Sequence, residues 1–361
     1  ADTATVSISG QKVSQTSITV TAETATTAIV AELVGSIAGD ALVTAETATT
    51  AISGQKISQT SITVTADTAT TAISAQKRMH ADLTVTADTA TVVFDADVVR
   101  QASVSVSAET ATTVISGQKI SQTSITVTAD PATAASTGQK ISQTNVTVTA
   151  DTATVVFDAD KISQTSITVT ADTATTAISA QLVHQTSLTV TAETATVSIS
   201  GVVSQIAGSV TAQADTATVA ISGQVIHQAA VSLTAPTGET SISGQKISQT
   251  SISAQADTAT VTIVTVAGAK TVTGTLAVQA ATAITGIVGQ RVVQTAVVVQ
   301  AQTAKARAFE VVIPLQLAPP AELFFHEPAV LFFASWPVKR IAAAVVLRAS
   351  AASTNIQGDV L

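Results

Sequence analysis

Apolar and polar residues alternate strictly along short stretches of this chain. In the segment 3–9 the apolar residues Ala4, Val6 and Ile8 are separated by single Thr or Ser residues, and the segment 17–22 repeats the alternation. A period of two is typical of a β-strand with one buried face. The pattern therefore predicts two strands, with Ala4, Val6 and Ile8 pointing inward on the first.

The alternation changes phase at two places, and each change predicts a bend. Between Ala22 and Ala25 the inward parity shifts across an acidic dipeptide, so we expect a corner or bulge there. The second bend is the segment 10–15, in which a glycine suits a tight turn and Val13 can form a short third face. Three faces of roughly seven residues predict a triangular coil.

A unit of about 21 residues is copied along most of the chain, which is the mark of a repeat architecture. The phrase Ala-(Asp/Glu)-Thr-Ala-Thr marks each copy, with Pro131 once replacing the first Thr, and rare insertions interrupt the period. The acids of this phrase are Asp2, Glu23, Glu46, Asp67, Asp88, Glu109, Asp130, Asp151, Asp172, Glu193, Asp215 and Asp257. One unit cannot bury enough apolar surface to fold alone, but stacked units share a core. We therefore predict an all-β, elongated repeat fibre of stacked units, either a β-solenoid or a trimeric β-helix.

The repeats divide the chain into three parts. They are regular over 1–262 and degenerate over 263–304, and a different composition follows over 305–361, where five of the seven prolines and the only tryptophan lie. Because repeat arrays need an atypical end, we expect a small β-rich module there that caps, trimerises or attaches the array. Its candidate attachment or recognition residues are Phe324, Phe325, Phe332, Phe333 and Trp336.

The composition argues against several classes of protein. A net charge of −8, with no local cluster of Lys and Arg, argues against nucleic acid as a partner. The chain has no cysteine, so disulfides cannot stabilise it. The apolar stretch 329–347 is interrupted by Pro337, Lys339 and Arg340, so we expect no membrane span.

Acidic residues are the first candidates for chemistry. Asp95 with Asp97, and Asp158 with Asp160, form the same Phe-Asp-Ala-Asp bend in units that lie three periods apart. Paired carboxylates can hydrolyse glycosides, and all four residues are weak candidates for calcium. A bend that recurs is expected of a copied repeat, however, and no Asp-x-Asp-Gly loop accompanies it. We predict no catalysis, no metal site and no cofactor, and we interpret the corner acids as an exposed ladder.

Histidine and threonine leave one further alternative. The four histidines lack partners at metal-ligand spacing, so we interpret them as exposed substitutions. Thr3 with Thr5, and Thr19 with Thr21, form the Thr-x-Thr pattern that some solenoid ice-binding proteins present on a flat face. Thr also suits exposed strands through β-branching and cross-strand pairing, and Ser often replaces it here. Ice binding therefore stays an alternative function.

The repeat at 115–130, Ile-Ser-Gly-Gln-Lys-Ile-Ser-Gln-Thr-Ser-Ile-Thr-Val-Thr-Ala-Asp, resembles in style the repeats of bacteriophage tail-fibre and minor tail proteins, over roughly residues 1–300. The resemblance implies an elongated homotrimer with one end on the virion and the other at the host surface. We expect a structural fibre, virion-associated or extracellular, that is a rigid spacer in host attachment and not an enzyme. Its expected partners are other virion structural proteins and a host cell-surface receptor or glycan. A bacterial surface adhesin or secreted filament is the alternative.

Overall fold

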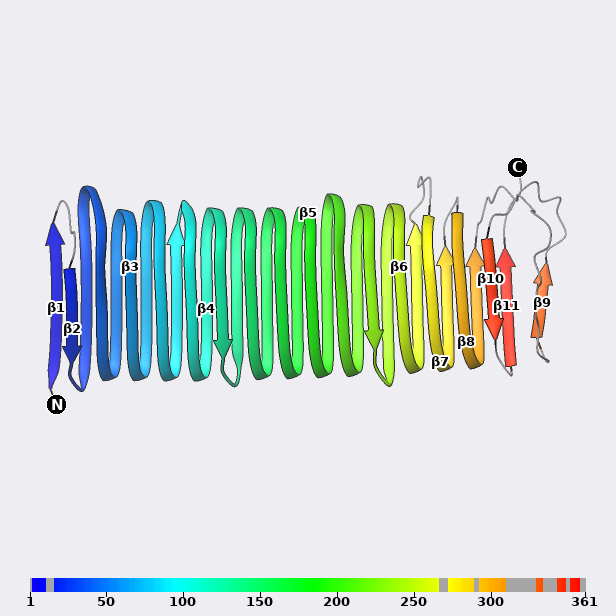
Figure 1. The fold of residues 1–361 in the computed structure, drawn as a ribbon, viewed down its shortest axis with the longest axis horizontal. Helices are drawn as coiled ribbons and strands as arrows, with labels where there is room; N and C mark the ends of the chain where they lie inside the picture. The colour runs from blue at the N-terminus through cyan, green and yellow to red at the C-terminus, as the bar shows by residue number, and fades with distance from the viewer. Residues whose placement is uncertain are drawn as a thin grey trace. The chain divides into compact units, whose positions relative to one another are not determined.

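All regular secondary structure in the described part of the chain is β-strand (Figure 1). The computed structural model describes residues 2–10, 16–265, 272–288, 292–309, 329–333, 343–348 and 351–357. The strands are β1 (Thr3–Gly10), β2 (Thr16–Thr21), β3 (Thr24–Ala96), β4 (Val98–Thr128), β5 (Ala132–Thr234), β6 (Thr237–Thr265), β7 (Val272–Val288), β8 (Val292–Phe309), β9 (Ala329–Phe333), β10 (Ala343–Arg348) and β11 (Ala351–Gln357). A search of these described residues finds no helix that could cross a bilayer.

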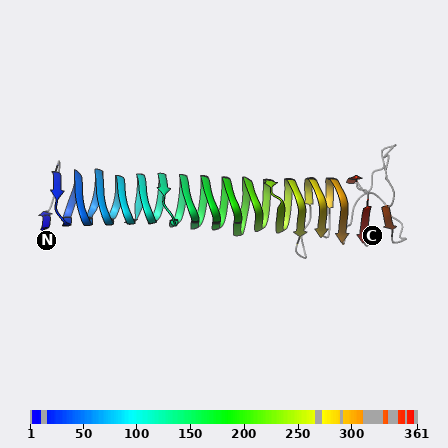
Figure 2. The ribbon, with the colours of Figure 1, turned by 90° about the horizontal axis from the view of Figure 1, so that it is seen from below.

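The chain forms two compact units, 1–180 and 181–361, and in the first unit the repeat period is the register of a parallel sheet. Thr3 of β1 lies opposite Thr24 of β3, and Ala111 of β4 lies opposite Ala132 of β5. The strands of successive coils lie side by side in the view from below (Figure 2). Because one chain supplies both strands of each described pair, the unit is a β-solenoid closed within a single chain.

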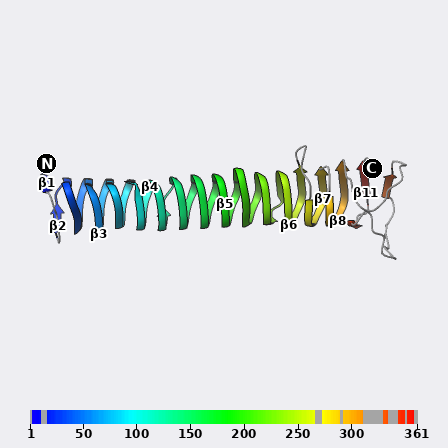
Figure 3. The same ribbon diagram turned by 90° about the horizontal axis from the view of Figure 1, so that it is seen from above.

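The second unit continues the same kind of ladder. Thr216 of β5 lies opposite Thr237 of β6, and Thr282 of β7 lies opposite Thr303 of β8. The strands β6, β7 and β8 follow one another along the stack in Figure 3. The strand β8 extends to Phe309, and β10 and β11 both pair with it in parallel. Parallel pairing therefore reaches into the segment 305–361, where we expected a separate module.

The direction of each side chain within a coil follows the predicted alternation. We number coil positions 1–21 from the acidic corner residue, so that in the coil 151–171 Asp151 is position 1. The buried residues of this coil are Ala153, Val155, Phe157, Ala159, Ile162, Thr165, Ile167, Val169 and Ala171. Asp151 and Thr152 are exposed and make the predicted corner. In the second bend, residues 159–164, Ala159 ends the first long face and Ile162 alone forms the short face, so the coil has two long faces and one short face, not three of similar length.

The tight turn of the second bend is made by glutamine rather than by the glycine that the sequence suggested. Position 14 is held by Gln122, Gln143 and Gln164, whose φ angles are 54°, 53° and 54°. A left-handed backbone costs a residue with a Cβ about 1–2 kcal/mol, so the ladders on both sides of the bend impose this conformation. Gly117 and Gly138 serve a different purpose, because a Cβ on Gly138 would overlap the carbonyl oxygen of Gly117.

The core consists mainly of Ala, Val and Ile side chains, with a few Leu and with Phe94 and Phe157 as its largest fully buried members. It also holds threonine, which the sequence analysis placed outside. Position 5, the position of Val6 in the first coil, is occupied by buried threonines whose hydroxyls have no hydrogen-bond partner: Thr27, Thr50, Thr71, Thr113, Thr176 and Thr240. Thr has nearly the shape of Val, so the column accepts either residue, but the buried hydroxyl is a cost.

We therefore expect Thr113→Val to raise the free energy of unfolding by about 1 kcal/mol, because the change removes an unsatisfied buried hydroxyl and keeps the branched shape. Val92 and Val155 already occupy this position in other coils and are fully buried. The measurement is urea denaturation of the full chain, with the exposed Thr126→Val as the matched control. A lower midpoint for Thr113→Val would show that the hydroxyl has a stabilising partner.

Candidate functional site

The four aspartates that the sequence singled out lie apart from one another as two pairs. Within each pair the side chains occupy positions 8 and 10, and the two pairs are three coils apart along the stack. Asp95 accepts a hydrogen bond of 2.9 Å from the Ser116 hydroxyl, which links it to the neighbouring coil. Asp158 and Asp160 are exposed. Among the described residues, no group of three or more His, Cys, Asp or Glu side chains could hold a metal ion.

The acids of the corner bond to the backbone of neighbouring coils. The backbone N–H of Asp2 donates to the Glu23 carboxylate at 3.1 Å, and the N–H of Asp151 donates to the Asp130 carboxylate. Charge-assisted bonds of this kind satisfy backbone donors at the corner, where the ladder is interrupted. The acidic ladder therefore has a structural use, in addition to its exposure.

The aromatic candidates of the C-terminal segment lie in β9 and around it. Phe324, Phe325 and Trp336 lie outside the described residues. Phe332 and Phe333 belong to β9, where they lie opposite Asn355 and Ile356 of β11, and the description there covers the backbone only. Their role in attachment stays a prediction.

One long face of the first unit carries many hydroxyl groups at its outward positions. We call the outward positions 16, 18 and 20 the hydroxyl face; in the coil 109–129 they are Ser124, Thr126 and Thr128. Positions 18 and 20 are exposed in five successive coils and contain only Thr or Ser: Thr84, Thr86, Ser105, Ser107, Thr126, Thr128, Thr147, Thr149, Thr168 and Thr170. Neighbours along the stack are in register, about 4.8 Å apart, and neighbours along a strand are about 6.6 Å apart. The result is a regular two-dimensional array of hydroxyls.

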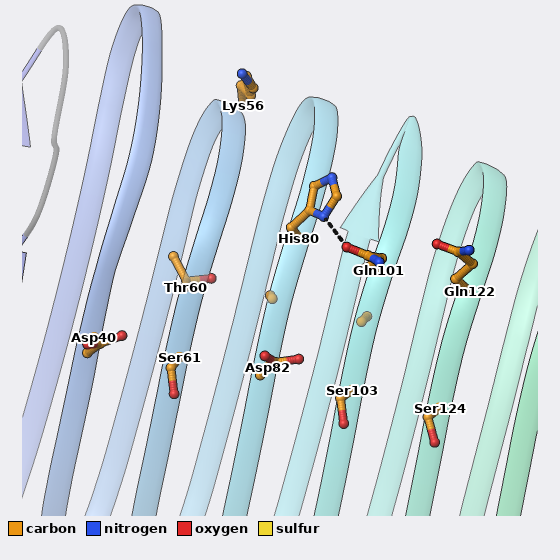
Figure 4. A pocket seen from close by; sticks show the side chains of 12 residues that line it. Asp40, Lys56, Thr60, Ser61, His80, Asp82, Gln101, Ser103, Gln122 and Ser124 are labelled. Atoms are coloured by element: carbon orange, nitrogen blue, oxygen red, sulfur yellow. Dashed lines mark hydrogen bonds between the residues drawn. The ribbon is translucent and has the colours of Figure 1, made fainter.

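A polar groove borders this face in the first unit (Figure 4). It is a hollow of about 820 Å³ that crosses five successive coils. One row of its lining comes from position 16 and consists of Asp40, Ser61, Asp82, Ser103 and Ser124; a second row comes from position 14 and consists of His80, Gln101 and Gln122. Thr60, Ala81 and Ala102 lie between the rows, and Lys56 lies at the rim. The hollow therefore presents carboxylates, amides and hydroxyls in two parallel rows.

The position-14 row is held in place and is shared with a second hollow. The ring nitrogen Nδ1 of His80 lies 3.1 Å from Oε1 of Gln101, at hydrogen-bonding distance. A smaller hollow of about 370 Å³ lies against the same row and contains Arg100 and Lys119. Because the two hollows share His80, Gln101 and Gln122, this row is a polar ridge between them.

The groove forms where several residues depart from the repeat. Position 16 is Ser in most coils but Asp at residues 40 and 82, and position 14 is Gln in most coils but His at residue 80. Position 15 is a buried Thr at Thr60 and Thr123 but the smaller Ala81 and Ala102 between them. These departures from the repeat belong to different coils, from Asp40 to Ala102. The fold brings them together at one surface.

Sequence reasoning missed this site. It interpreted His80 as an exposed substitution and did not single out Asp40 or Asp82. The available signal was the replacement of Ser by Asp twice in one column, at positions that lie two periods apart. Because equivalent positions of successive coils stack, two substitutions in one column lie on the same face.

A second hollow of similar volume lies along the acidic corner of the second unit. Its lining includes Gln213, Gln255 and Gln279, which replace the Thr of position 20, together with Asp215 and Asp257. Its carboxylates belong to the regular corner ladder and are not departures from the repeat. It is therefore the weaker candidate for a specific site.

Comparison with known protein families, with curated proteins and with solved structures gave no match.

Proposed function

We propose that this chain is a structural fibre of a virion, a tail fibre or appendage that acts as a rigid spacer in host attachment. The observation that supports the proposal is the regular parallel register, in which equivalent residues of successive repeats lie opposite each other over coil after coil within each unit. Each coil contacts its neighbours alone, so length can be added by copying without a new core. The repeat style at 115–130 supports the virion setting.

The proposed assembly is a homotrimer. Because each coil is closed within one chain, three chains would associate side by side and not wrap into a common coil. Sedimentation equilibrium of the full chain at micromolar concentration tests this, with three chain masses as the expected result. Immunogold labelling of particles from the source culture tests the location. A monomer would overturn the trimer, and labelling of the cell surface alone would favour an adhesin or secreted filament.

Ice binding is the second candidate function, and the hydroxyl face is the observation that favours it. Exposed Thr or Ser side chains hold positions 18 and 20 in five successive coils, and β-branching limits each Thr to few rotamers. Hydroxyls in such an array can hold water molecules at two regular spacings, about 4.8 and 6.6 Å.

If the face binds ice, we expect the full chain to show thermal hysteresis, and Thr147→Lys to abolish most of it, because one bulky charge interrupts the regular array. Thr175→Lys is the matched control, since Thr175 is exposed at position 4, on the other long face. Freezing-point measurements under a microscope decide the question. Absence of hysteresis in the unmodified chain would remove this candidate.

A further inference from the structure

We propose that the polar groove of the first unit binds a neutral linear glycan, which lies across the coils with its sugar hydroxyls on the position-14 and position-16 rows. This inference deepens the proposed role in host attachment, on which its biological meaning rests. Three features support the proposal: the geometry of the groove, the chemistry of its lining, and the position of Asp40, His80 and Asp82 within the repeat.

The groove offers one set of polar groups per coil. Asp82 lies opposite Ser103 in the parallel ladder, and His80 lies opposite Gln101. Coils are about 4.8 Å apart, so the position-16 row presents hydrogen-bonding groups at a constant step over roughly 19 Å, and the position-14 row does so over roughly 10 Å. A polymer of pyranose units is the biological chain that presents hydroxyls on both sides at a comparable step. A linear glycan can therefore repeat the same contacts from coil to coil.

The lining suits sugar hydroxyls because it contains both acceptors and donors. The carboxylates of Asp40 and Asp82 can each accept bonds from two neighbouring hydroxyls, and charge-assisted bonds are the stronger kind. The amide of Gln122 and the hydroxyls of Ser103 and Ser124 can donate as well as accept. The two carboxylates of the row are two coils apart, about 9–10 Å, with Ser61 between them.

Other classes of ligand fit the groove less well. The underlying strands are paired on both sides, so no free edge is available for an added peptide strand, and Ala81 and Ala102 offer no apolar pocket of useful depth. Two carboxylates and a net charge of −8 oppose a phosphate backbone. The two carboxylates outnumber the one cation of the lining, Lys56, and so oppose an anionic glycan in this groove. Of the ligand classes compared, a neutral glycan therefore fits the groove best.

The departures from the repeat provide the second, independent argument. Ser would satisfy the solenoid at position 16, as it does at residues 61, 103 and 124, and Gln would satisfy it at position 14. Neither Asp40 nor Asp82 is buried, and Asp82 replaces a residue that the neighbouring coils hold without a charge. The substitutions therefore add chemistry to the surface without a visible contribution to the core, and they add it at one place.

The test begins with the full chain on an array of neutral and anionic linear oligosaccharides, followed by calorimetric titration with the neutral hexasaccharide that is retained best. Asp82→Ser and His80→Gln restore the residues of the repeat and should leave the fold intact. We expect Asp82→Ser to weaken binding at least tenfold and His80→Gln several-fold. Asp158→Ser is the matched control, because it also restores a repeat residue but lies on the other long face, and it should leave the affinity unchanged.

Each outcome decides the proposal. Retention of no neutral glycan, or of anionic glycans alone, would overturn it. Binding that Asp82→Ser and His80→Gln leave unchanged would show that the sugar is held elsewhere, which also overturns it. Because the titration uses the isolated chain, its result is independent of the trimer and of the virion location, and failure of the fibre proposal can be recognised separately.

Discussion

Replacing Ile125 by aspartate is expected to lower the free energy of unfolding by roughly 4 kcal/mol or more, because the change removes a buried branched side chain and places a carboxylate in an apolar core. Ile125 is at position 17 and is 1% exposed. The residues at the same position of the adjacent coils, Val104 and Val146, are buried and apolar, so they offer the carboxylate no partner. We expect loss of the cooperative transition in urea, followed by circular dichroism, at least for the coils around residue 125.

The matched control lies one residue further along the strand. Thr126 is exposed on the hydroxyl face, and Thr126→Asp should change the free energy of unfolding by less than about 1 kcal/mol. If the alternation is correct, aspartate at these two adjacent residues should therefore change the free energy of unfolding by amounts that differ by several kilocalories per mole. Equal effects at the two residues would mean that the inward parity of this face is wrong.

Replacing Phe157 by alanine is expected to lower the free energy of unfolding by about 3–5 kcal/mol through the cavity it leaves. Phe157 is 1% exposed and is one of the two largest fully buried side chains. It occupies position 7, where most coils have Ile, so Phe157→Ile restores the repeat residue and should cost much less. Urea denaturation of the two variants measures the difference.

The damage from Phe157→Ala should also be local. In a stack of repeats each coil contacts its neighbours alone, so stability is nearly a sum of coil and interface contributions. Hydrogen exchange should therefore show lost protection in the coils around 130–171, while the coil 46–66 keeps its protection. Uniform loss throughout the chain would contradict the view that coils unfold in neighbouring groups.

The same one-dimensional architecture explains which features of the core were predictable. The alternation and the change of parity at Asp151 and Thr152 are local properties of a strand and a corner, and a strand has a fixed side-chain period of two. Position 12, filled by Ile162 in the coil 151–171, also followed from one apolar residue in a polar bend. The inward threonines were not predicted, because the local sequence around Thr113 is like that around an outward Thr. Its inward direction is recognised only from the buried Val at the same position of the neighbouring coil.

The candidate site was less predictable than the core for a physical reason. Asp40 and Asp82 lie two periods apart in the sequence, and His80 was compared with its sequence neighbours, not with Gln101 of the next coil. Only stacking places these residues in two rows. The sequence directed attention to Asp95 and Asp158, where two carboxylates are close in sequence, but the coil separates those pairs by three layers.

By itself the amino-acid sequence determined the repeat period, the all-β class and most inward positions, because these depend on side-chain alternation and on copies that must stack to bury their apolar faces. The tertiary structure alone decided that one chain closes the coil, that glutamine takes the left-handed turn, and that Asp40, His80 and Asp82 share a groove. Those features depend on which residues lie opposite each other across coils, and the coil register that sets this exists only once the chain has folded.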